Sequence, residues 1–372
     1  MNEPTRKPRV AIVFGGRSSE HAISCVTAGS VLAAIDRDRY DVVPIGIAAD
    51  GRWVLEADDP ERLQINGRTL PAVDGGRAGL LLTREGGSTD LVVQEPSRPP
   101  TTLGEVDVVF PLLHGPWGED GTLQGMLEMA GVRYVGAGVL ASAVGMDKAF
   151  MKVVLSAAGL PVMPSVTITA REWAADAQSC RDQAAGLGYP LFVKPARGGS
   201  SLGISKAHDA SELGDCLAEA HEHDPKALVE VSAEGGREIE VGVLQRLDGG
   251  VDTTQPAEIR IGGDHEFYDF EAKYLPEEHT ELDVPADLPA DVAEELRSLA
   301  ARAFAALECE GLARVDFFVM PDGRVVLNEI NTMPGFTPTS MYPRMWAASG
   351  VAYPELVDRL IRLALARDTG LR

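Results

Sequence analysis

The sequence has few cysteines and few positive charges. Four of its 372 residues are cysteine, and Cys25, Cys180, Cys216 and Cys309 lie far apart, without the spacing of a metal-binding or redox motif. We therefore expect reduced, mostly buried thiols. The 34 Lys and Arg residues are outnumbered by 56 Asp and Glu residues, and the net charge is −22. This charge repels polyanions, so it argues against a protein that binds nucleic acid or an anionic membrane surface.

The sequence also has no apolar run of the length that crosses a bilayer. Its N-terminal apolar run, residues 10–14, is too short for a signal peptide and leads into Gly15-Gly16. We therefore expect a cytoplasmic protein. At about 150 residues per domain, the length predicts two or three domains. Glycine is abundant, with 39 residues, which indicates tight turns and loops that approach a ligand closely.

The first part of the chain has the pattern of a parallel α/β sheet. An apolar run over residues 8–14 ends at a glycine pair and is followed by a helical pattern up to Ala33. Further strands are predicted at residues 41–47 and 107–111. Strand, glycine turn, helix and strand is how such a sheet begins. The polar stretch of residues 67–103 is interpreted as hairpins or an insertion.

The remaining sequence alternates between helices and strands. A helix near Asp147, a helix over residues 170–187 and the strands PLFVKPA and ALVEVSA predict a small α+β domain. Beyond it, strands are predicted at residues 238–245, 314–320 and 324–330, and an amphipathic helix at residues 290–307. The acidic segment 262–285 is predicted to be a long loop, and loops of that length are usually functional lids.

A glycine-rich loop follows Lys194 in the segment FVKPARGGSSLGISK. A lysine beside a loop with many free backbone N–H groups suits a polyphosphate. The loop is not a Walker A motif, because the lysine precedes the glycines. An ordinary hairpin turn is the alternative interpretation.

Two predicted strands carry polar residues on one face. Strand alternation places Arg314 and Asp316 on the same side, and Glu329 and Asn331 likewise share a face across the PDG turn. Asp316, Glu329 and Asn331 can thus present hard oxygen ligands together, a set that suits Mg²⁺ with substrate phosphates. A solvated strand face is the alternative, but it does not explain why polar residues interrupt apolar strands.

Two further polar residues follow strands of the first sheet. His114 comes at the carboxyl end of a strand, where open α/β sheets bind ligands, and Glu20 follows the first glycine turn. A structural histidine and a helix-start carboxylate are the corresponding alternatives.

These segments resemble a known family. GGRSSEH, HGPWGEDGTLQG, GMDK, VKPARGGSSLGISK, FYDFEAKY, RVDFFV and NEINTMPGFTPTS occur in the order found in D-alanine–D-alanine ligases of the ATP-grasp superfamily. The resemblance implies an α/β ATP-grasp fold. It implies an N-terminal Rossmann-like (pre-ATP-grasp) parallel-sheet domain (1–145, with the polar insertion 67–103). A small α+β central domain (146–230) and a C-terminal domain with the metal and substrate site (231–372) would follow.

By the same resemblance, ATP is clamped between the central and C-terminal domains. The residues implied to bind ATP are Lys148, Lys194, Glu230, Val231, Ala233, Glu238, Phe267, Lys273 and Asn328. Asp316, Glu329 and Asn331 resemble the ligands of two Mg²⁺ or Mn²⁺ ions. A requirement for a monovalent cation stays open.

The resemblance also implies how two D-alanine molecules are joined through an acyl phosphate for peptidoglycan synthesis. Glu20, Ser200 and Tyr274 correspond to a hydrogen-bonded triad around the first D-alanine, with His114 nearby. Arg314 and the Gly335 N–H correspond to the oxyanion donors. Ser340, Lys273 and Met341 correspond to the site of the second D-alanine. A homodimer is expected, with neither nucleic acid nor membrane as a partner.

Three alternatives are weighed against this hypothesis. D-alanine–D-lactate ligases of this superfamily differ in the EAKY loop, which is intact here as Glu271-Ala272-Lys273-Tyr274, and other carboxylate–amine ligases stay possible. A dinucleotide-dependent oxidoreductase is disfavoured, because Gly15-Gly16 lacks the G-x-G-x-x-G spacing. A non-catalytic nucleotide sensor is disfavoured as well, because it would need no oxyanion donors, whereas Arg314, Gly335 and Ser340 are present.

Overall fold

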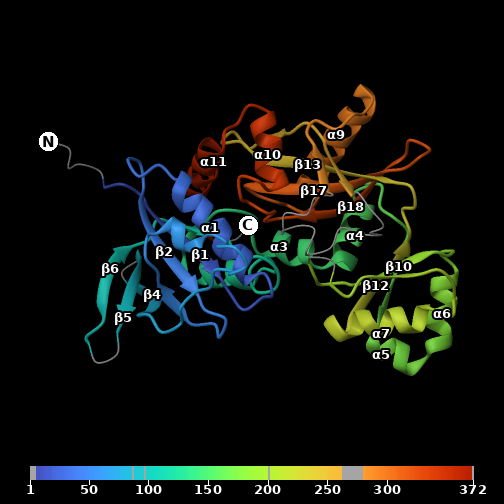
Figure 1. Cartoon of the computed structure of the whole chain (residues 1–372), viewed down its shortest axis with the longest axis horizontal. Helices are drawn as coiled ribbons and strands as arrows, with labels where there is room; N and C mark the ends of the chain where they lie inside the picture. The colour runs from blue at the N-terminus through green and yellow to red at the C-terminus, as the bar shows by residue number, and fades with distance from the viewer. Residues whose placement is uncertain (1–5, 86–87, 96–97, 200–201, 262–279, 371–372) are drawn as a thin grey trace.

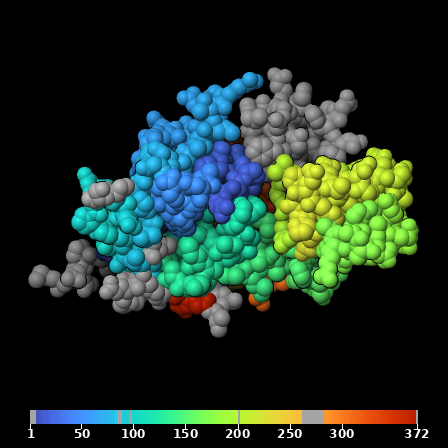
Figure 2. All heavy atoms as spheres, turned by 90° about the horizontal axis from the view of Figure 1, so that it is seen from below, coloured from blue at the N-terminus to red at the C-terminus, as the bar shows by residue number. Residues whose placement is uncertain are grey.

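The computed structural model describes residues 6–85, 88–95, 98–199, 202–261 and 280–370, and here three β-sheets follow one another along the sequence (Figure 1). The blue and cyan residues of the first sheet lie at the opposite end of the molecule from the yellow-green residues of the second (Figure 2). Among the described residues, every helix is too short or too polar to cross a bilayer. All four cysteines are buried and unpaired, as predicted for thiols that pack as small apolar residues.

The first sheet has the strand order β6-β5-β4-β3-β2-β1-β7-β8. Its strands are β1 (Arg9–Gly15), β2 (Asp41–Ile47), β3 (Trp53–Leu55), β4 (Gly79–Glu85), β5 (Ser88–Gln94), β6 (Thr101–Glu105), β7 (Val108–Pro111) and β8 (Arg133–Tyr134). Strands β2, β1, β7 and β8 are parallel, as predicted, whereas β3 to β6 are antiparallel. The polar stretch 67–103 therefore forms hairpins that widen the sheet. The helical segments of this part are α1 (His21–Ala34), the short 3₁₀ helix η1 (Pro60–Leu63), α2 (Thr122–Ala130) and α3 (Val139–Met146).

The second sheet is antiparallel, with the order β11-β10-β12-β9. Its strands are β9 (Ser165–Thr169), β10 (Leu191–Pro195), β11 (Ser205–Ala207) and β12 (Lys226–Val231), and the helices of this part are α4 (Lys148–Ala157), α5 (Ala170–Ala175), α6 (Ala177–Ala185) and α7 (Leu213–His223). The prediction of one helix over residues 170–187 was wrong. The Asp176 carboxylate accepts a hydrogen bond from the Ser179 N–H and starts a new helix, as capping side chains do.

The third sheet has the order β16-β15-β13-β17-β18, and β14 pairs with β13. Its strands are β13 (Arg237–Gln245), β14 (Val251–Thr253), β15 (Ala257–Ile261), β16 (Thr280–Asp283), β17 (Leu312–Val319) and β18 (Val325–Asn331), and its helices are α9 (Ala290–Ala306), α10 (Met341–Ala348) and α11 (Tyr353–Ala366). The amphipathic helix predicted at residues 290–307 is confirmed as α9. The prediction of a loop over residues 262–285 was wrong for the last part of this segment, because β16 lies there and pairs with β15.

One hydrophobic core joins the first sheet to the end of the third part. Phe14 of β1 and Phe110 of β7 are fully buried in the same cluster as Leu356 and Leu360 of α11. Figure 1 shows α11 beside α1 at the first sheet. Because apolar burial is the main favourable term in folding, these segments stabilise each other although they are far apart in sequence.

Helix α4 packs its apolar face on the third sheet. Met151 and Leu155 are fully buried in a second core together with Leu296 and Phe304 of α9. The Ile330 N–H of β18 donates to the Met151 sulfur at 3.4 Å. The polar face of α4 is therefore left to point toward the space between the second and third sheets.

Candidate active site

The polar face of β17 and β18 lies as strand alternation predicted. Arg314 is opposite Asn331 in the ladder, and Asp316 is opposite Glu329. The Asn331 amide nitrogen lies 3.0 Å from Asp316 Oδ2 and 3.5 Å from Glu329 Oε1. The pairing of the two strands shifts by one residue after Asp316, and Asn328 is the extra residue at this irregularity. Two carboxylates and one amide thus meet on one face of the sheet.

Arg314 is fixed by two carboxylates. Its Nε and Nη2 atoms lie 2.8 and 2.7 Å from the two oxygens of Asp316, and Nε lies 3.2 Å from Glu240 Oε1. Burial lowers the pKa of Arg314, but Asp316 and Glu240 outweigh it and raise that pKa well above the usual range. Arg314 is therefore a permanent, oriented cation, since paired planar donors leave a guanidinium little freedom.

Two lysines face this carboxylate set from other elements. Lys148, the first residue of α4, has its ammonium 2.7 Å from the Gly198 carbonyl oxygen and 3.5 Å from Glu329 Oε2. Lys194, on β10, pairs with Glu230 on the neighbouring strand β12. Burial raises the pKa of Glu230, but the two neighbouring ammoniums of Lys194 and Lys152 have the larger effect. The pKa of Glu230 is therefore lowered from its usual value to about 2.

The polar residues from the first sheet reach the same cavity. Glu20 is the residue immediately before α1, and its carboxylate lies against the turn after His114. A Cβ added to Gly115 in this turn would be 2.8 Å from Glu20 Oε2. The same oxygen would lie 3.5 Å from a Cβ on Gly199, so Glu20 also borders the glycine-rich loop. Burial lowers the pKa of His114, although Glu20 and the Met333 backbone oppose the shift. A neutral imidazole therefore lies beside the carboxylate at neutral pH.

The segment that follows β18 lines one side of a cavity. Ser340 caps this turn, since its N–H donates to the Thr337 carbonyl oxygen at 2.9 Å and its hydroxyl lies 2.8 Å from Thr337 Oγ1. Phe336 is fully buried, and its carbonyl oxygen accepts a hydrogen bond from Tyr353 at 2.7 Å. The Gly335 backbone is therefore held by the anchored Phe336 that follows it and by Ser340, whose hydroxyl would lie 3.1 Å from a Cβ on Gly335.

One cavity of about 360 Å³ collects these groups. The residues of the sequence hypothesis that line it are Glu20, His114, Lys148, Lys194, Glu230, Val231, Ala233, Glu238, Arg314, Asp316, Asn328, Glu329, Asn331, Gly335, Ser340 and Met341. Four others, Ser200, Phe267, Lys273 and Tyr274, lie outside the described residues.

Sequence reasoning missed two polar groups of this region, Glu240 and Lys152, and assigned no role to a third, Glu119. Glu240 follows Glu238 by two residues on β13, so strand alternation could have found it. Lys152 lies one helical turn after Lys148, so helix periodicity could have predicted that both lysines lie on the same face of α4. Glu119 follows Gly115 by four residues in the loop after His114, and it accepts a hydrogen bond from the Gly115 N–H at 2.5 Å. Burial and Glu20 raise its pKa to about 8.

Solved structures define the fold class. VanG D-Ala:D-Ser ligase from Enterococcus faecalis is similar with a TM-score of 0.82 and 33% identity, over 96% of this chain and all of that one. The D-alanine–D-alanine ligase from Coxiella burnetii has a TM-score of 0.80 and 34% identity, over 97% and 94% of the two chains. The protein is thus an α/β protein with the ATP-grasp fold, as the family resemblance implied.

Family comparisons narrow this class. A model described as D-ala D-ala ligase N-terminus matches residues 9–137, and one described as D-ala D-ala ligase C-terminus matches residues 154–362. A D-alanine–D-alanine ligase from Streptomyces avermitilis is 57% identical over all of this chain and 97% of its own length. The chain belongs to the D-alanine–D-alanine ligase family.

Proposed function

We propose that the protein joins two D-alanine molecules at the expense of ATP. The products are D-alanyl-D-alanine, ADP and phosphate, and the dipeptide serves peptidoglycan precursor synthesis. One observation carries the proposal: lysines, carboxylates and Arg314 from three parts of the chain that are far apart in sequence line one cavity, in a chain that is 57% identical to a D-alanine–D-alanine ligase.

ATP would bind between the second and third sheets. Lys148 and Lys194 are proposed to hold the α- and β-phosphates, because both ammoniums border the cavity from separate elements. Val231 and Ala233 would meet adenine through their backbone, beside the Glu230 side chain, and Glu238 would accept from the ribose hydroxyls. Phe267 and Lys273 complete this set in the sequence hypothesis, together with Asn328.

The donor set of β17 and β18 fits a hard divalent cation. Two carboxylates and one amide on one face are few enough to leave positions for phosphate oxygens and water, which Mg²⁺ prefers. We propose that Asp316, Glu329 and Asn331 hold two Mg²⁺ or Mn²⁺ ions. These ions would neutralise phosphate charge and polarise the phosphoryl group. A monovalent cation is not assigned a site.

The substrates would lie between Glu20 and the 335–340 turn. Glu20 is proposed to receive the ammonium of the first D-alanine, whose carboxylate attacks the γ-phosphate of ATP and releases ADP. The amine of the second D-alanine then attacks the acyl phosphate carbonyl. Arg314 and the Gly335 N–H would stabilise the tetrahedral oxyanion before phosphate leaves. Ser340 and Lys273 would hold the second carboxylate, and Met341 its methyl group.

Water must be excluded, because it would hydrolyse the acyl phosphate. The sequence hypothesis assigns this task to Ser200 and Tyr274, which would bridge to Glu20 when the loops close. The position of Gly199 supports this assignment, because Gly199 borders the Glu20 carboxylate.

The second substrate distinguishes the alternatives. The similar structure from Enterococcus faecalis is a D-Ala:D-Ser ligase, but it is 33% identical, whereas D-alanine–D-alanine ligases reach 57%. We therefore propose D-alanine rather than D-serine or D-lactate at the second position. Equal amounts of dipeptide and depsipeptide from D-alanine and D-lactate at neutral pH would contradict this choice.

Phosphate release from ATP tests the proposal directly. We expect D-alanine to stimulate release with one phosphate per dipeptide formed, and L-alanine to have no effect. Mass spectrometry of the product with D-alanine, D-serine or D-lactate identifies the second substrate. Release of phosphate that no amino acid stimulates would refute the ligase proposal.

The remaining assignments are also proposals. We propose domains at residues 1–145, 146–230 and 231–372, a cytoplasmic homodimer, and no nucleic-acid or membrane partner. Exposed apolar side chains on neighbouring helices, Met126 and Met129 on α2 and Leu140 on α3, support a protein contact surface there. Sedimentation of the wild-type protein and of Met129→Glu tests the dimer.

A further inference from the structure

Lys152 is a buried lysine that the proposed mechanism does not use. It lies on α4 one turn after Lys148, and only 4% of its surface is exposed. Lysine is rarely buried to this extent unless its charge is paired. The Lys152 ammonium lies 2.8 Å from Glu230 Oε2, across the gap between α4 and β12.

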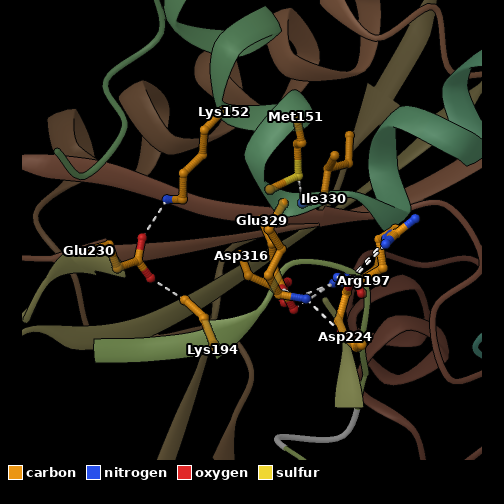
Figure 3. Close-up of polar contacts among 12 residues, drawn as sticks. Met151, Lys152, Lys194, Arg197, Asp224, Glu230, Asp316, Glu329 and Ile330 are labelled. Carbon is orange, nitrogen blue, oxygen red and sulfur yellow. Dashed lines mark hydrogen bonds and ion pairs between the residues drawn. The ribbon is translucent and has the colours of Figure 1, made fainter. Parts of the chain in front are cut away.

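Glu230 is shared between two lysines. Its Oε2 faces Lys152, and its Oε1 pairs with Lys194, so the carboxylate lies between the two ammoniums (Figure 3). All three side chains are at least nine-tenths buried. Burial lowers the pKa of Lys152, and Glu230 opposes that shift. With both lysines protonated, two cations and one anion leave one net positive charge, and Lys194 is the lysine of the pair that lines the cavity.

The two lysines of α4 serve different partners. Lys148 points to Gly198 and Glu329 at the proposed phosphate and metal site, whereas Lys152 points to Glu230. The helix itself is anchored by Met151 in the core of the third sheet. Lys152 therefore connects the body that carries the proposed metal ligands to the sheet that carries Lys194.

We propose that Lys152 is a positioning residue for the nucleotide: it neutralises Glu230 and thereby leaves the charge of Lys194 for the phosphates. This inference rests on the proposed function. Without Lys152, Lys194 alone neutralises the buried carboxylate, and the Lys194–Glu230 pair has no net charge to offer an anion. Coulomb interactions in a poorly solvated cavity are strong enough for this loss to weaken binding.

The experiment measures MgADP binding by calorimetry, together with steady-state kinetics. We expect Lys152→Met to weaken MgADP binding and to raise KM for ATP, each about tenfold, while KM for D-alanine changes less than twofold. Lys152→Arg keeps the charge and should restore binding to within about threefold. If Lys152→Met does not fold, Lys152→Gln replaces it, since glutamine keeps a donor without the charge.

A double-mutant cycle tests whether Lys152 acts through Glu230. In the Glu230→Gln background no carboxylate remains to be neutralised, so adding Lys152→Met should change MgADP affinity less than twofold. An equal loss in both backgrounds would refute the positioning role. The matched control is Lys226→Met, which removes an ion pair between β12 and Asp147, the residue that caps the N-terminus of α4. It should lower Tm while leaving MgADP affinity unchanged.

The outcomes separate the inference from the proposed function. If the wild-type protein binds no MgADP, the proposed function fails. If the wild-type protein binds MgADP and Lys152→Met binds it equally well, only the inference about Lys152 fails. A loss of affinity in Lys226→Met equal to that in Lys152→Met would also refute it, because general destabilisation would then explain both.

Discussion

Replacing Gly115 with alanine should damage the site of the first D-alanine more than it damages the fold. Gly115 has φ +74°, in the left-handed region, and an alanine Cβ there would lie 2.8 Å from Glu20 Oε2. An ordinary contact begins near 3.4 Å. The Glu20 carboxylate must therefore move by a few tenths of an ångström, and by about 0.6 Å to reach an ordinary contact. Displacements approaching 1 Å can cost on the order of 100-fold in rate.

The expected result for Gly115→Ala is a 10- to 100-fold fall in kcat/KM for D-alanine, within the range that such displacements allow. Phosphate release at saturating ATP, followed against D-alanine concentration, measures it. KM for ATP should change less than about threefold, because the lysines proposed to hold its α- and β-phosphates, Lys148 and Lys194, lie on separate elements.

Gly249→Ala is the matched control. Gly249 has φ +85° in the turn between β13 and β14, and a Cβ there meets nothing within 4 Å. Both variants carry the same left-handed strain, about 1–2 kcal/mol. Their Tm values should therefore fall similarly, while Gly249→Ala keeps full activity. If the two variants have equal kcat/KM for D-alanine, the reasoning about Glu20 is wrong.

Three further predictions concern the same cavity. Arg314→Lys keeps the charge but loses the paired hydrogen bonds to Asp316, so kcat should fall on the order of 100-fold; an unchanged kcat would remove Arg314 from the proposed oxyanion site. Asn331→Ala should raise the Mg²⁺ concentration needed for half-maximal activity tenfold or more, in a titration after metal removal by EDTA. The raised pKa of Glu119 means that the folded protein holds this proton more tightly than the unfolded chain does. Its contribution to stability is full at low pH and lost as pH rises through about 8. The Tm of the wild-type protein, measured by calorimetry, should therefore fall between pH 6 and pH 9. The Tm of Glu119→Gln should fall less over the same range.

The polar face of the third sheet could be predicted because strand geometry is local. Alternation alone assigns Arg314, Asp316, Glu329 and Asn331 to one side, and the ladder register confirms it. Asn328 does not follow from alternation. The register shift beside Asp316 brings it to the cavity, and such irregularities depend on how neighbouring strands pair.

The buried charges could not be predicted in the same way. Helix periodicity places Lys152 on the same side of α4 as Lys148, but it does not reveal that β12 brings a carboxylate to that side. Likewise, the pKa of Glu119 depends on burial by the whole fold and on Glu20, which is about a hundred residues earlier in the sequence. The break at Asp176, in contrast, was a local signal, because aspartate is a preferred helix cap.

The core shared by the first sheet and α11 has a consequence for synthesis on the ribosome. Strand β7 ends at Pro111, and α11 begins at Tyr353, roughly 240 residues later. At about 5–20 residues per second, the apolar face of the first sheet waits roughly 12 to 50 s for its covering helix. During this interval Phe14 and Phe110 lack their final packing partners. The nascent chain thus exposes part of the apolar surface of the first sheet until the last helix emerges.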